Sequence, residues 1–235
     1  MGFISGLPSL GVVIFQGCIL VILLVAMRRR DVAAAVNALV SFVAVFLPLF
    51  VELLAREGGS TTVDFGPALP LWIAVAGLLH SIGMLGPYDS VRWWDTLTHT
   101  VSAMLVAALV YAGLVVVAGE TATGGQWTSG VAAMTVLFMI AVGVFWELIE
   151  LVAREVGERY DVEPVLVYYG WRDTASDLVF DVVGTLIVVV FDLRLFVPVA
   201  AAYPSSTRRL LVGSAAAILG GSLIMALIVY FGRTR

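Results

Sequence analysis

Residues 9–27 read SLGVVIFQGCILVILLVAM, and a second run of the same character, VAAAVNALVSFVAVFLPLFVELL, follows at 32–54. Each run is close to the length of about 20 mostly apolar residues that a helix needs to cross a bilayer. Only the three arginines at 28–30 and Asp31 separate the two runs. This stretch therefore predicts two membrane-spanning helices joined by a short charged turn.

The composition agrees with this prediction over the whole chain. Of 235 residues, 61% are hydrophobic and 13% are charged, and the mean hydropathy is +1.04. Soluble domains carry about 25% charged residues, so an ordinary water-soluble protein and a disordered chain are both excluded. The net charge of −4 leaves no basic surface, and we expect no nucleic-acid partner. The single cysteine, Cys18, permits neither an internal disulfide nor a cysteine metal site.

Further apolar stretches predict an all-α polytopic bundle of about seven spans, forming a single transmembrane domain over residues 1–235. The predicted spans are 9–27, 32–54, 67–85, 97–118, 128–153, 174–198 and 209–231. Arginine-rich loops stay cytoplasmic, and an N-out, C-in arrangement places nine of the 13 basic residues inside. We therefore expect a multi-pass protein of the plasma membrane, surrounded by lipid, whose one sizeable loop is 154–173.

Ionisable residues within the predicted spans are the most informative feature. A charge near the bilayer centre costs at least about 2.5–3.5 kcal/mol, so such residues usually face the protein interior and have a function. The set comprises Asp95 and His99 around the start of span 97–118, Glu147 and Glu150 near the end of 128–153, and Asp173, Asp177 and Asp181 around the start of 174–198. Residues three or four apart share a helix face, so each helix presents its set in one direction.

In the predicted topology these three helix ends lie on the inner side of the membrane. Glu147 lies seven residues before Arg154 and His99 lies seven after Arg92, which is ~10 Å along the helix in both cases. We therefore predict one shared polar site on the spans 97–118, 128–153 and 174–198, near the cytoplasmic surface. His80, near the inner end of the preceding span, is a further candidate.

Several carboxylates gathered in one place must be neutralised. A divalent metal is one solution, and carboxylates with one imidazole suit Mg, Mn, Fe or Zn. The predicted metal ligands are His99, Glu147, Asp177 and Asp181, with Asp173 and His80 as further candidates. Asp95 and Glu150 are then the predicted catalytic residues, in acid–base or supporting roles. Shared protons are a second solution, and a cationic substrate or Arg172 is a third.

Structural explanations exist for several of these residues. Asp95 and Asp173 could be helix N-caps that complement the helix dipole. Glu150 could pair with Arg154 one turn later, and His80 could be a hydrogen-bonded core histidine. The remaining three acids fit such explanations least, because they lie a turn or more inside apolar sequence with few arginines nearby.

The motifs WDTLTH at 94–99, FWELIEL at 145–151 and DTASDLVFDVVGTLI at 173–187 resemble those of the VanZ-like membrane proteins and, more closely, the YjdF-like inner-membrane proteins. The resemblance covers about residues 80–195. It implies an integral membrane protein of unsettled biochemistry. The family positions that it implies are Asp95, His99, Glu147, Glu150, Asp173, Asp177, Asp181 and Gly184.

Three functions fit these observations. The first is a metal-dependent enzyme acting on a lipid or polyprenyl head group, because the predicted site lies one or two turns below the membrane surface. The second is a proton- or cation-coupled transporter, whose carboxylates would carry the coupling ion. The third is a non-catalytic accessory subunit whose polar cluster fixes helix packing. At this point all three stay open, as do the metal and the oligomeric state.

Overall fold

The computed structural model describes residues 2–57, 64–119, 129–160 and 170–232, and the regular structure in these ranges is entirely helical. The chain forms two compact units, Met1–Thr98 and His99–Arg235, with the boundary inside helix α5. Each unit is described by itself below.

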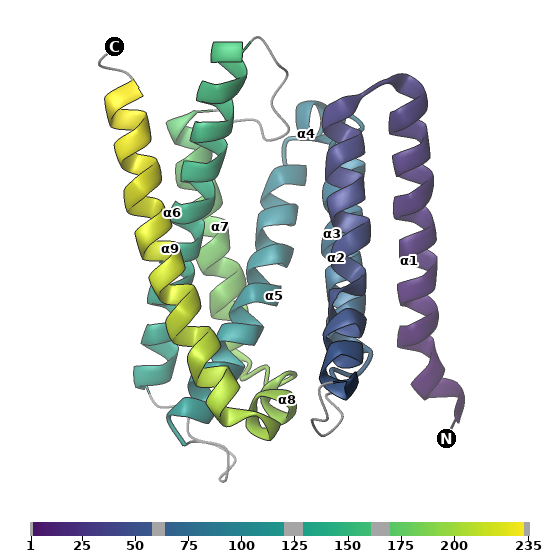
Figure 1. The fold of residues 1–235 in the computed structure, drawn as a ribbon, viewed down its shortest axis with the longest axis vertical. Helices are drawn as coiled ribbons and strands as arrows, with labels where there is room; N and C mark the ends of the chain where they lie inside the picture. Colours follow the sequence, from purple (N-terminus) through teal and green to yellow (C-terminus); the bar gives the residue numbers. More distant parts are fainter. Residues whose placement is uncertain (1, 58–63, 120–128, 161–169, 233–235) are drawn as a thin grey trace. The chain divides into compact units, whose positions relative to one another are not determined.

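The first unit contains α1 (Gly2–Arg29), α2 (Val32–Glu57), α3 (Ala68–Gly83) and the short α4 (Pro87–Ser90), followed by the start of α5. Helices α1, α2 and α3 pack side by side (Figure 1). Asp31 accepts a hydrogen bond from the Ala34 amide at 2.9 Å and so caps the start of α2. An apolar core cluster of this unit is formed by the buried residues Ile19, Ile22, Ala38, Val45 and Ala74.

The second unit contains most of α5 (Trp94–Val117), α6 (Ser129–Tyr160), α7 (Trp171–Val190), the short α8 (Val197–Ala202) and α9 (Pro204–Gly232). Helix α6 packs against both α7 and α9. Helices α5 and α7 run in one direction and α6 and α9 in the opposite one (Figure 1). The start of α7 and the end of α6 therefore lie at the same end of the unit.

Five of the helices are long and apolar enough to cross a membrane. They are Ser9–Arg29, Val32–Leu54, Trp94–Val117, Gly130–Tyr160 and Pro204–Phe231. The apolar α3 is shorter, at 16 residues, and α7 carries three aspartates in its 20 residues. The prediction of an all-helical, multi-pass membrane protein is confirmed in this form. The count of seven spans, their orientation and the single domain stay predictions.

Two predicted boundaries are wrong. The loop expected at 154–173 is shorter, because α6 continues to Tyr160, where the ion pair between Arg154 Nε and Glu158 Oε1 at 2.8 Å supports the extra turns. Residues 161–169 lie outside the described residues. The span expected to reach 198 ends at Val190, because Asp192 adopts a positive φ of 48° that stops the helix.

Candidate metal centre

His99 lies on α5 between two aspartates of α7. Its Nδ1 is 3.3 Å from Asp181 Oδ1, and its Nε2 is 3.9 Å from Asp177 Oδ2. Asp177 and Asp181 are four residues apart and so share one face of α7. The side chains of His99 and Asp177 are only 10% and 4% exposed, so this contact is shielded from the surroundings.

A glycine brings these two helices close enough for the contact. Gly184 continues the aspartate face of α7, and a Cβ at this position would lie 2.6 Å from the carbonyl oxygen of Thr100 on α5. No side chain fits into that space, so α7 lies directly against the α5 backbone. Any larger residue would push the aspartates away from the histidine.

Asp95 completes a group of three possible metal ligands. It lies one turn before His99 on the same helix, and Asp95, His99 and Asp177 each offer one ligand atom, all within 4.8 Å of one another. One imidazole and two carboxylates suit zinc, iron or manganese. The sequence predicts a catalytic role for Asp95 beside the metal, whereas this geometry also allows Asp95 to bind the metal itself.

Asp181 faces the opposite nitrogen of the same imidazole. Metal-binding histidines almost always donate their second ring N–H to a carboxylate, carbonyl or water, which fixes the ring orientation. Asp181 Oδ1 stands at that place relative to Nδ1. This geometry suits Asp181 as the partner that orients His99, while its predicted role as a ligand stays open.

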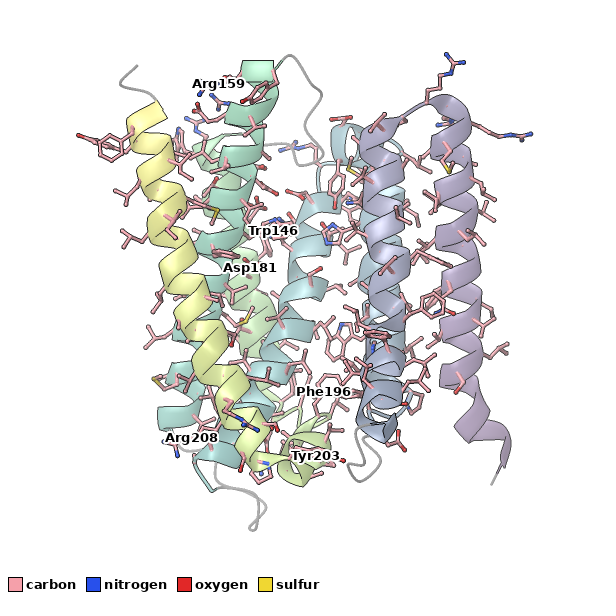
Figure 2. The ribbon with its side chains drawn as sticks, viewed as in Figure 1. Trp146, Arg159, Asp181, Phe196, Tyr203 and Arg208 are labelled. Carbon is pink, nitrogen blue, oxygen red and sulfur yellow. The ribbon has the colours of Figure 1, made fainter. Side chains whose placement is uncertain are left out.

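Glu147 of α6 lies beside this group without belonging to the three residues whose ligand atoms converge. It is 8% exposed and interacts electrostatically with His99, Asp173 and Asp181. Thr174 also faces Glu147, and its hydroxyl oxygen is buried. In Figure 2, Asp181 and Trp146, the neighbour of Glu147, lie at heights between Arg159 and Arg208, which are near the two ends of the unit.

The remaining predicted residues are not among the three whose ligand atoms converge. Glu150 accepts a hydrogen bond from the Trp146 indole at 3.0 Å in an exposed pair, and Asp173 lies in the first turn of α7. His80 lies in the first unit, where its Nδ1 is 2.6 Å from the Tyr88 hydroxyl. That bond agrees with the structural explanation of His80.

In the same unit, Asp192 and Arg194 form the pair that their spacing suggests, but the contact of Tyr111 with this pair was not predicted. The fully buried Tyr111 of α5 donates a hydrogen bond of 2.5 Å to Asp192 Oδ1, which also accepts one of 2.8 Å from Arg194 Nε. Burial alone raises the pKa of Asp192, but the bonds from Arg194 and Tyr111 outweigh it and hold that pKa below its ordinary value. A tyrosine amid apolar residues gives no sequence signal for this contact.

Residues 10–197 match a family described as predicted membrane proteins, DUF2238. The chain belongs to this family. No curated protein and no solved structure matches the chain. The DUF2238 match includes α1 from residue 10 onward and all of α2, whereas the motif resemblance covered only about residues 80–195. The VanZ-like and YjdF-like resemblance and the plasma membrane location stay predictions, and the multi-pass membrane character is confirmed.

Proposed function

We propose that the chain is a membrane-embedded enzyme that uses a divalent metal bound by Asp95, His99 and Asp177. The observation that carries this proposal is the convergence of three ligand atoms within 4.8 Å. The carboxylate of Asp181 on the other side of the imidazole supports it, because such a partner accompanies metal-binding histidines.

Charge balance favours a divalent ion at this place. Two ionised aspartates bring two negative charges into a shielded region, and unpaired buried charges are costly. A divalent cation neutralises both, while a neutral imidazole adds no charge. Such an ion can polarise a phosphate or carbonyl oxygen of a substrate.

The position of the site along its helices favours the head group of a lipid or polyprenyl carrier as substrate. Asp177 lies six residues after Trp171, where α7 begins, which is ~9 Å along the helix. Trp171 is 71% exposed and Tyr160, at the end of α6, is 67% exposed. Exposed aromatic residues are typical of the membrane–water interface. The site is thus within reach of a head group and remote from the acyl chain ends.

Metal analysis of the purified, detergent-solubilised chain tests the metal site. We expect a stoichiometric divalent ion in the wild type and in Glu150→Gln, which changes an acid outside the three ligands, and loss of the ion in Asp177→Asn. Vesicles containing phosphatidic acid or polyprenyl diphosphate then test the reaction through phosphate release. A wild type without bound divalent ion after metal supplementation refutes the metal site.

Glu147 gives a specific reason to keep a transporter as second candidate. It adds a buried acid next to the three proposed ligands, and no arginine of the described ranges forms an ion pair with it. Intramembrane carboxylates of this kind carry coupling ions in transporters. Cation or proton flux into proteoliposomes that falls in Glu147→Gln would favour this function, whereas unchanged flux would exclude a coupling role for Glu147.

A further inference from the structure

Gly143 lies in the middle of α6, where a glycine is unfavourable. Glycine in a helix interior costs roughly 0.5–1 kcal/mol relative to alanine, because the flexible backbone loses more entropy on folding. A glycine at such a position needs a compensating close contact. Gly143 lies four residues before Glu147, on the face of α6 that carries the buried acid.

The carboxylate of Asp181 occupies part of the space that a side chain at Gly143 would fill. A Cβ on Gly143 would lie 2.7 Å from Asp181 Oδ2 and 2.7 Å from Leu178 Cδ2. The other oxygen, Oδ1, is the one that faces His99 Nδ1 at 3.3 Å. The carboxylate of Asp181 therefore lies between the α6 backbone and the imidazole, with one oxygen directed to each.

This arrangement limits how the structure can respond to a side chain added at Gly143. Both atoms that a Cβ would meet are the ends of side chains, so Asp181 and Leu178 can move without a shift of the helix backbones. Asp181 is short, however, and any rotation that removes Oδ2 from the new methyl group also moves Oδ1 away from Nδ1. Alanine at position 143 thus disturbs the imidazole contact before it disturbs the fold.

We propose that Gly143 is a positioning residue, which holds the Asp181 carboxylate against His99 so that Nδ1 keeps its proton and Nε2 faces Asp177. The hydrogen bond is a property of the chain alone. Only the use of Nε2 for metal binding rests on the proposed function.

The chain offers a matched control for the added methyl group. Gly113 of α5 is also closely packed, and a Cβ there would lie 2.9 Å from Leu211 Cδ1 on α9. Gly113→Ala therefore introduces a comparable steric conflict between two other helices. It leaves the contact between Asp181 and His99 untouched.

Histidine-selective ¹⁵N NMR of the metal-free protein tests the proposal. The chain has two histidines, and His80→Gln assigns their rings. We expect a slowly exchanging, hydrogen-bonded Nδ1 proton on His99 in the wild type and in Gly113→Ala. Loss of that resonance is expected in Gly143→Ala and in Asp181→Ala, with the His80 signals unchanged.

The proposal is overturned if the wild type lacks this proton or if Gly143→Ala keeps it. If Gly143→Ala does not fold, Leu178→Ala added to it removes one of the two conflicts and leaves the methyl group against Asp181. Metal affinity gives a second readout: Gly143→Ala should bind 10–100-fold more weakly, as expected for loss of a residue that orients a ligand. A wild type that binds no metal refutes the proposed function, while the Nδ1 proton still decides the role of Gly143.

Discussion

Replacement of Gly184 by alanine tests whether the close approach of α5 and α7 builds the site. The added Cβ would lie 2.6 Å from the Thr100 carbonyl oxygen and 3.2 Å from both Ala103 Cβ and the Met104 amide nitrogen. Two of these three atoms belong to the α5 backbone, so the helices themselves must separate. Extra methyl groups in a well-packed interior cost about 1–3 kcal/mol.

Thermal unfolding in detergent measures this cost. For a chain of this size, 1 kcal/mol corresponds to about 2–4 °C in Tm, so we expect Gly184→Ala to lower Tm by about 2–12 °C. The separation also moves Asp177 and Asp181 from His99, so metal affinity should fall in parallel. Gly220→Ala is the matched control, because its Cβ would meet nothing within 4 Å. A Gly184→Ala protein that unfolds at the wild-type temperature would show that α5 and α7 do not pack as described.

Three further predictions concern individual side chains. Asp177→Asn should weaken divalent metal binding by about 70-fold or more, because four-ligand zinc sites bind with about 10–16 kcal/mol, or ~2.5–4 kcal/mol per ligand. Isothermal titration measures this affinity, and Asp173→Asn one turn earlier should change it only severalfold. Tyr111→Phe should destabilise the chain by about 1.5–3 kcal/mol in thermal unfolding, since it removes a hydrogen bond to a carboxylate. Because the pKa of Asp192 is lowered, its bonds to Tyr111 and Arg194 stabilise the fold fully above pH ~4, and this contribution is lost as the pH falls through the lowered pKa. In Asp192→Asn the free energy of unfolding should therefore fall less steeply with decreasing pH below pH ~4. An unchanged dependence on pH in this range would contradict the prediction.

The apolar parts of the first two helices were predictable to within two residues. The runs at 9–27 and 32–54 match the candidate spans Ser9–Arg29 and Val32–Leu54, although α1 itself begins at Gly2. The ends of α6 and α7 were not predictable in the same way. The segment after residue 153 is polar enough for a loop, and only the pairing of Arg154 with Glu158 shows that it continues the helix. A positive φ at Asp192 ends α7 within sequence that is still apolar.

The sequence predicts which residues of the candidate site share a helix face, but it does not predict which of their atoms meet. Four-residue spacing correctly places Asp177 and Asp181 on one buried face of α7. Spacing cannot tell which imidazole nitrogen each aspartate meets, because this depends on the distance between two helices. Gly184 sets that distance, and its missing side chain carries no chemistry of its own.

Helix α5 contacts α7 through His99 and Asp181, and it contacts the turn just after α7 through Tyr111 and Asp192. Along α5 these contacts are twelve residues apart, or ~18 Å. These two contacts oppose a sliding motion of α5 along α7, since a shift by one helical turn would break both of them together. Displacement of α6 or α9 breaks neither contact, so we expect α5 and α7 to move together if this unit opens.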